Sequence, residues 1–294
     1  MAKFASPGRQ AESVSKDLKD SISSVGTLRN YTQALTRVAE HLSETKSGSL
    51  REITPEKAEI YLAERSQEVG QKTLDMERQA LQSMMQNVTS KLEQSAKLDV
   101  VKSELSQALE SRSYTTAQIA AISNAQTERN SLATQIAHSA GLRAHELLTL
   151  QRIDERAPSD RPALDSKFDG RSDTSTAYTV QGKGGLIREV QIPNHLAQRL
   201  EERRLEAPRQ VTDRGIHYES RYDIAGGKNW SNSFSAASER AIGHSTGAHG
   251  IRHSYAQERM NELAQKGYDR DKALETVSQE MGHFRPEITE VYLR

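Results

Sequence analysis

The chain has no cysteine among its 294 residues. Disulfide bonds, thiolate nucleophiles and cysteine-ligated zinc or iron–sulfur sites are therefore excluded. Long apolar runs are also lacking, and none approaches the length of a membrane span. The first ten residues have no apolar core of the kind found in signal peptides. With a mean hydropathy of −0.75, these absences predict a soluble, cytoplasmic protein with no membrane partner.

The chain also has no excess of positive or negative charge. Lysine plus arginine and aspartate plus glutamate each number 40. Because DNA-binding domains are often clearly basic, this balance argues against nucleic-acid binding unless basic side chains gather on one face. The length suggests two domains, each able to bury its own core.

Apolar residues recur every three or four positions from Leu28 to Leu42, which predicts a helix that begins at Thr27 and buries one face. Thr54-Pro55-Glu56 predicts the start of a second helix, because a hydroxyl cap, a first-turn proline and an early acid all favour it. We expect that helix to reach about Val69 and a third to begin at Thr73. These patterns predict a helical domain over residues 1–110.

Residues 111–294 are predicted to form a second domain that opens at Tyr114. The clearest strand pair is Ala177–Val180 with Leu186–Ile192, since both segments are rich in β-branched residues. Residues 207–229 are expected to be irregular. Helices are expected at 116–124, 128–139, 143–150, 194–205, 231–242, 250–265, 271–279 and 286–292. The fold class is therefore mainly α with a small antiparallel β-sheet, in two domains.

The segment Gly141-Leu142-Arg143-Ala144-His145-Glu146-Leu147 places an arginine just after a helix-breaking glycine. Such an arginine can point into a cleft from a fixed backbone. Glu146, three residues on, can accept from its guanidinium and fix its orientation. The alternative is an ordinary surface ion pair at helical spacing.

Lys183 lies between the two expected strands, in Gly182-Lys183-Gly184-Gly185. An ammonium group at the tip of a hairpin could bind a phosphate or protonate a leaving oxygen. The alternative is a solvated turn lysine. The segment is not a phosphate-binding P-loop, because the glycine spacing and the following Ser or Thr are absent.

The last 46 residues contain four side chains that could meet at one point: His249, Arg252, His283 and Tyr292. His249 and Arg252 are three residues apart and share a helix face. The planar donor fork of arginine suits phosphate oxygens, and a tyrosine can act as a covalent nucleophile. A metal pair at His249 and His253 is discounted, since no third ligand is evident.

The order of these pieces is GLRxxEL, a lysine between two strands, HxxRH, GH and a tyrosine nine residues later. This order resembles the tyrosine recombinase, or phage integrase, family over about residues 114–294. The resemblance over 1–110 is carried by TLRNYTQALTRVAEHL, which is similar to the first helix of a core-binding domain. The family pattern maps onto Arg143, Lys183, His249, Arg252, His283 and Tyr292, with Glu146 as the supporting acid.

The resemblance implies a two-domain clamp around double-stranded DNA and site-specific recombination or integration, as in mobile genetic elements. Tyr292 would form a 3′-phosphotyrosyl bond and Lys183 would protonate the 5′ oxygen. His249 would accept the phenol proton or bind the phosphate, and His283 would donate to a non-bridging oxygen. The two arginines would stabilise charge without a metal or other cofactor.

By the same resemblance, four protomers would exchange strands between two DNA sites. Only two residues follow Tyr292 here, so we expect contacts other than a long C-terminal tail, and a monomer in free solution. Two alternatives remain at this point. One is a type IB topoisomerase, which shares the chemistry but acts alone, and the other is a catalytically silent DNA-binding protein of the same fold.

Overall fold

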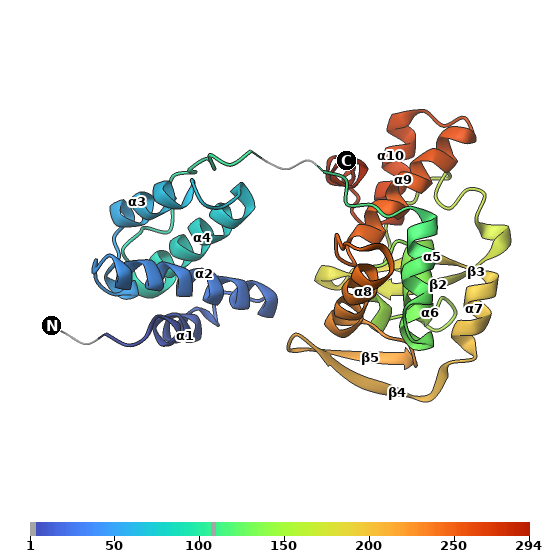
Figure 1. Cartoon of the computed structure of the whole chain (residues 1–294), viewed down its shortest axis with the longest axis horizontal. Helices are drawn as coiled ribbons and strands as arrows, with labels where there is room; N and C mark the ends of the chain where they lie inside the picture. The colour runs from blue at the N-terminus through green and yellow to red at the C-terminus, as the bar shows by residue number, and fades with distance from the viewer. Residues whose placement is uncertain (1–3, 107–109) are drawn as a thin grey trace. The chain divides into compact units, whose positions relative to one another are not determined.

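The computed structural model describes residues 4–106 and 110–294, apart from the side chain of Lys183. The chain divides into two compact units, Met1–Ala108 and Leu109–Arg294, drawn in Figure 1. The fold class is as predicted, mainly helical with small antiparallel sheets. Within the described ranges, no helix is long and apolar enough to cross a membrane.

The N-terminal unit is a helical bundle. Its α-helices are α1 (Pro7–Leu18), α2 (Val25–Glu44), α3 (Pro55–Arg65) and α4 (Gln71–Met84). The predicted cap of α3 is confirmed, because Thr54 accepts from the backbone N–H of Lys57. That helix ends at Arg65 rather than near Val69. Helix α4 begins at Gln71, two residues before the predicted start, and continues through a π-helical turn, Met85–Thr89.

Among the described residues of this unit, the buried carboxylate is that of Glu77 on α4. It accepts 2.8 Å from the hydroxyl of Tyr61 and 3.2 Å from Nε of Arg65, both on α3. Since a buried charge is tolerated only when it is paired and hydrogen-bonded, this network fixes α3 against α4.

In the C-terminal unit, helices pack around a three-stranded antiparallel sheet (Figure 1). The sheet order is β1 (Gln151–Arg152), β2 (Ser175–Gln181) and β3 (Ile187–Pro193), and a separate hairpin pairs β4 (Arg204–Asp213) with β5 (Ile216–Tyr222). The α-helices are α5 (Thr116–Asn124), α6 (Glu128–Ser139), α7 (Asn194–Glu201), α8 (Gly227–Ile242), α9 (Gly250–Gln265), α10 (Arg270–Glu280) and α11 (Pro286–Thr289). A final 3₁₀ turn, Glu290–Leu293, carries Tyr292.

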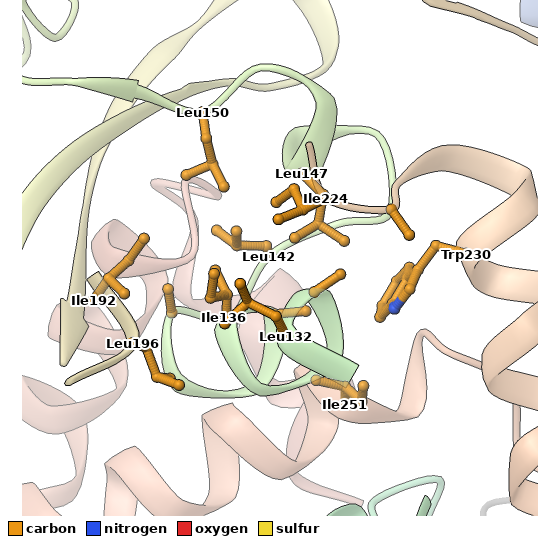
Figure 2. Close-up of a cluster of buried hydrophobic side chains, with 14 of the residues drawn as sticks. Leu132, Ile136, Leu142, Leu147, Leu150, Ile192, Leu196, Ile224, Trp230 and Ile251 are labelled. Carbon is orange, nitrogen blue, oxygen red and sulfur yellow. The ribbon is translucent and has the colours of Figure 1, made fainter. Parts of the chain in front are cut away.

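Figure 2 shows how the core of this unit joins segments far apart in the sequence. Leu132 and Ile136 on α6 lie among Ile192 of β3, Trp230 of α8 and Ile251 of α9. Burial of such large apolar side chains is the main driving force for folding. The core thus fixes the start of α9, where His249 and Arg252 lie, relative to the sheet.

Three local predictions for this unit are wrong. Residues 143–150 do not form an α-helix: the segment makes turns and a 3₁₀ helix at Glu146–Leu148, and strand β1 follows it. The segment 207–229 is not irregular, since it contains most of the β4–β5 hairpin and the start of α8. Helix α7 ends at Glu201, short of the predicted position 205.

Candidate active site

The turn that carries Arg143 begins at a glycine that cannot be replaced without strain. Gly141 has a φ of 60°, and a Cβ there would lie 2.7 Å from the ring of Tyr255. Its carbonyl oxygen accepts from Nη1 of Arg252 and, at 3.3 Å, from Nη2 of Arg188. The backbone oxygen of Gly141 therefore holds the guanidinium groups of Arg252 and Arg188, two residues before Arg143.

Glu146 is fully buried and orients the arginines around it. One carboxylate oxygen accepts 2.8 Å from Nη1 of Arg143, and the other accepts 2.8 Å from the Arg143 backbone N–H and 2.8 Å from Nη2 of Arg188. Nη1 of Arg252 lies 3.9 Å from the same carboxylate. Burial alone would raise the pKa of Glu146, but Arg188, Arg252 and Arg143 together hold it well below its ordinary value.

Arg252 lies on α9 and is fully buried. Besides its bond to Gly141, Nη2 donates 3.2 Å to the carbonyl of Met281 and 3.0 Å to Nε2 of His283. Burial and the nearby cation of Arg143 lower the pKa of Arg252 to about 10, so it remains charged at neutral pH. Its Nε is buried without a hydrogen-bond partner among the described residues. This donor set is suited to a phosphate oxygen.

His283 is neutral in this arrangement. Arginine has donors only, so Nε2 of His283 accepts from Arg252 and the ring proton lies on Nδ1. Nδ1 then donates 3.1 Å to the hydroxyl of Thr289. Burial and the cation of Arg252 lower the pKa of His283 to about 3, in agreement with a neutral ring.

Tyr292 is buried, with 8% of its surface exposed, and three imidazole rings surround its ring. The ring centroid lies 4.8 Å from that of His253, 5.0 Å from that of His283 and 5.4 Å from that of His249. Cζ of Arg252 lies 5.6 Å from the same centroid. The carbonyl of Tyr292 accepts 3.2 Å from the side-chain amide of Gln257 on α9, which holds the last turn in place.

His249 caps the start of α9 and is the solvent-exposed member of this group. Although part of the residue is open to solvent, burial of its imidazole ring and the cation of Arg252 lower the pKa of His249 to about 4. A neutral imidazole next to a phenol can accept the phenolic proton. The ring is therefore in the state that the predicted role requires.

Lys183 lies where predicted, between β2 and β3, but its side chain is outside the described residues. The preceding Gly182 passes close to Glu146, since a Cβ on Gly182 would lie 3.4 Å from Oε1 of that residue. The turn thus borders the Arg143–Glu146 pair.

A cavity of about 250 Å³ opens beside Arg143 and His249. Arg214, at the turn between β4 and β5, and His145 also line it, so its wall has four basic residues. The neighbouring Asp213 accepts 2.8 Å from the backbone N–H of Lys228 and so ties this turn to the start of α8. The cavity can admit an anion between side chains that carry or can acquire positive charge.

Sequence reasoning missed two residues of this site. From the sequence alone, Arg188 has no assigned role. Arg188, Val190 and Ile192 occupy alternate positions along β3, and all three side chains are buried, so an arginine there is unexpected. His253 was considered only as a metal ligand and discounted, yet its ring is the nearest of the three imidazoles to Tyr292. His253 is the final histidine of the HxxRH pattern, and that pattern could have identified it as a site residue.

Residues 16–91 match the family model described as the phage integrase N-terminal SAM-like domain. Among solved structures, the chain is similar to the XerH site-specific recombinase bound to a palindromic difH substrate in a post-cleavage complex. That match has 17% identity and a TM-score of 0.61, and covers 98% of this chain and 81% of the other. A comparison with curated proteins gives no significant match.

The chain is also similar to a lambda integrase dimer bound to a COC′ core site, with 15% identity, a TM-score of 0.61 and coverage of 97% and 76%. A third similar structure is the Tn1549 transposon integrase in complex with circular intermediate DNA, with 14% identity, a TM-score of 0.53 and coverage of 99% and 96%. The chain therefore has the fold of the tyrosine recombinases. The match of residues 16–91 to the SAM-like domain of the phage integrases agrees with the family resemblance that the sequence predicted.

Proposed function

We propose that this protein is a site-specific DNA recombinase that cleaves and rejoins DNA strands through a covalent tyrosyl intermediate. The observation that carries the proposal is the convergence of Tyr292 with Arg252, His249 and His283. All three lie within 6 Å of the phenol ring, measured to Cζ of the arginine or to the ring centroids of the histidines. Arg143 belongs to the same network through the shared carboxylate of Glu146.

In the proposed reaction, Oη of Tyr292 attacks the phosphorus of a DNA phosphodiester. The bond from phosphorus to the 5′ oxygen breaks as the 3′-phosphotyrosyl bond forms, so the number of phosphoester bonds is unchanged and no nucleotide cofactor is needed. The phenolic proton passes to neutral His249, and Lys183 supplies a proton to the departing 5′ oxygen. Rejoining reverses these steps with the 5′ hydroxyl of another strand.

Arg143 and Arg252 stabilise the charge that develops on the non-bridging oxygens, as fixed cations do in phosphoryl transfer. When a phosphate takes up Nη2 of Arg252, Nε2 of His283 is released from its present bond. The ring proton of neutral His283 would then sit on Nε2 after a change of tautomer, with the Thr289 hydroxyl donating to Nδ1, and Nε2 would donate to a non-bridging oxygen. This exchange of partners gives His283 its proposed role beside Arg252.

The partner is double-stranded DNA, in keeping with the DNA complexes that the similar structures contain. We propose that the SAM-like helical domain and the catalytic domain both contact the recombination site, and that four protomers act on two sites. A balanced net charge means that non-specific affinity, which comes mainly from phosphate contacts, should be modest. Specific binding then depends on contacts from both domains.

Covalent capture tests this function. The wild-type chain is incubated with a pool of randomised duplexes, each nicked so that the short cleaved fragment diffuses away and rejoining stops. Denatured protein that carries DNA is then isolated, and the attached strands are sequenced. We expect adducts joined through a 3′ phosphate and enriched in one sequence. Enriched binding without any adduct would instead identify a catalytically silent DNA-binding protein.

A further inference from the structure

Arg188 is a buried arginine in the middle of the site. The proposed chemistry assigns it no role. Only 4% of it is exposed, and strand β3 places it opposite Val180 of β2. Nη1 donates 2.7 Å to the carbonyl of Glu280, at the end of α10. Nη2 donates 2.8 Å to the carboxylate of Glu146 and 3.3 Å to the carbonyl of Gly141.

These three acceptors lie in two segments that carry the site, the turn after α6 and the end of α10. Glu146 holds Arg143, the Gly141 carbonyl also binds Arg252, and Glu280 lies three residues before His283. Gly282, next to His283, packs directly on the arginine: it has a φ of 73°, and a Cβ there would lie 2.7 Å from Cδ of Arg188. One guanidinium group thus spans the turn after α6, strand β3 and the loop after α10.

We propose that Arg188 is a positioning residue for DNA cleavage, whose guanidinium holds Glu146, and through it Arg143 and Arg252, in the arrangement that receives the phosphate. This inference rests on the proposed function of the same site. Arg188 itself is only 4% exposed, and both of its terminal nitrogens already donate to protein acceptors. Its contribution is to geometry and charge and not to contact with DNA.

The charges around Glu146 give this role a measurable signature. The basic groups that face it are Arg143 from the turn, Arg188 from β3, Arg252 from α9, and the imidazoles of His145 and His283. Against the effect of burial, Arg188 is the largest of the influences that lower the pKa of Glu146. Loss of Arg188 should therefore raise that pKa, and Glu146 should become protonated at a higher pH than in the wild type.

A protonated Glu146 loses its charged hydrogen bond with Arg143. Cleavage by Arg188→Met should therefore decline at a higher pH than cleavage by the wild type, in addition to a fall of about a hundredfold from misplaced groups. The double variant Arg188→Met with Glu146→Gln cannot titrate at this position, so the shifted acid limb should disappear. Arg188→Lys keeps the charge but cannot reach three acceptors, so we expect a near-normal pH profile with an intermediate rate.

Arg259→Met is the matched control for burial. Arg259 is 1% exposed and donates 3.0 Å to the buried carboxylate of Glu280. Within the described part of the chain it makes no hydrogen bond or ion pair with Glu146. If Arg188 served folding alone, both Met variants would lose stability and keep the wild-type pH profile. A difference in pH profile at similar loss of stability separates the two roles.

The experiment measures single-turnover cleavage against pH for the full chain and these variants, on a nicked duplex carrying the sequence enriched by covalent capture. Thermal unfolding of each variant is recorded in parallel. A shifted acid limb in Arg188→Met, absent in the double variant and in Arg259→Met, is the expected result. Cleavage by Arg188→Met that falls only with its folded fraction, with an unchanged profile, would overturn the inference while leaving the recombinase function intact.

A second measurement applies even if the wild type and every variant fail to cleave DNA, an outcome that would defeat the proposed function. The side-chain carboxyl of Glu146 is titrated by NMR in isotope-labelled wild-type protein and in Arg188→Lys, with Glu146→Gln identifying the signal. Wild-type Glu146 should stay ionised to lower pH than an ordinary glutamate. An ordinary glutamate titration in the wild type would refute the positioning role independently of cleavage.

Discussion

Nη2 of Arg252 donates a hydrogen bond of 3.0 Å to Nε2 of His283. The arginine cannot accept, so the bond fixes the neutral tautomer of the histidine and directs its other nitrogen to Thr289. The group proposed to receive a phosphate is thus held by a protein acceptor when no DNA is present. A phosphate must compete with His283, with the Met281 carbonyl and with the Gly141 carbonyl for this guanidinium.

The neutral state of the histidines leads to a prediction about pH. Because kcat/KM reports groups of the free enzyme, its acid limb should follow the lowered pKa of His249, which is about 4. Below that value the ring is protonated and cannot accept the phenolic proton, and above it the ring is neutral. We expect cleavage to be flat from about pH 8 to about pH 6, where an ordinary histidine would titrate, and to fall only at lower pH.

The measurement is kcat/KM for cleavage against pH, with circular dichroism at each pH as the control for folding. The His249→Asn variant should lose rate, and the acid limb that His249 produces should disappear from its profile. An acid limb in the wild type near the ordinary histidine value, with the fold intact, would contradict the neutral-base assignment.

Lys183 is predicted to protonate the departing 5′ oxygen. If so, a substrate with sulfur in place of that oxygen should restore cleavage to Lys183→Ala, because a thiolate leaves without a proton. Arg143→Ala should gain far less from the same substrate, since its defect lies in charge stabilisation. Cleavage rates on the oxygen and sulfur substrates decide this, and equal recovery in both variants would remove the assignment.

Cleavage is predicted to need no divalent metal, since Arg143 and Arg252 supply the positive charge that a metal ion would otherwise contribute. Adduct formation by the wild type should therefore be unchanged in excess EDTA. Activity that disappears with the chelator and returns only on addition of a divalent ion would favour a metal-dependent nuclease. The ionic strength is held constant throughout, because DNA binding depends on salt.

A prediction on stability concerns Glu77 in the helical unit. Glu77→Ala leaves the Tyr61 hydroxyl and Arg65 without their buried acceptor. Removing one partner of a buried ion pair should cost about 3 kcal/mol. Glu68→Ala removes a carboxylate that is 66% exposed and also pairs with Arg65, and should cost less than about 1 kcal/mol. Amide hydrogen exchange in α4 of the full chain compares the two, and equal effects would refute the role of the buried network.

The sequence predicted helices well where periodicity and capping agreed, as at Thr54 and α3, and the family pattern predicted the fold. The β4–β5 hairpin was missed because most of its side chains are exposed, so no alternation of apolar and polar residues marks its strands. Residues 143–150 were mistaken for a helix for a different reason. Leu147 enters the core from a 3₁₀ turn and Leu150 from the residue just before strand β1, and their spacing of three residues imitates a helical face.

Among the predicted site residues, Arg143 with Glu146 and Arg252 with His283 are brought into direct contact. The order of residues in the sequence could suggest these two pairs, but not the hydrogen bonds that join one pair to the other. Arg188 illustrates the limit, because its three acceptors lie 42, 47 and 92 residues away along the chain. Only the folded arrangement shows that one buried guanidinium joins them.

Covalent adduct formation by Tyr292→Phe tests the central claim most directly, with Tyr255→Phe as the matched control. The hydroxyl of Tyr255 is buried and donates 2.8 Å to Glu280, and burial together with that carboxylate raises its pKa, so it is a poor nucleophile. Both variants are incubated with the nicked duplex recovered by covalent capture, and DNA binding is measured alongside. We predict that Tyr292→Phe binds DNA but forms no adduct, whereas Tyr255→Phe still forms one. A 3′-linked adduct that persists in Tyr292→Phe would show that Tyr292 is not the nucleophile.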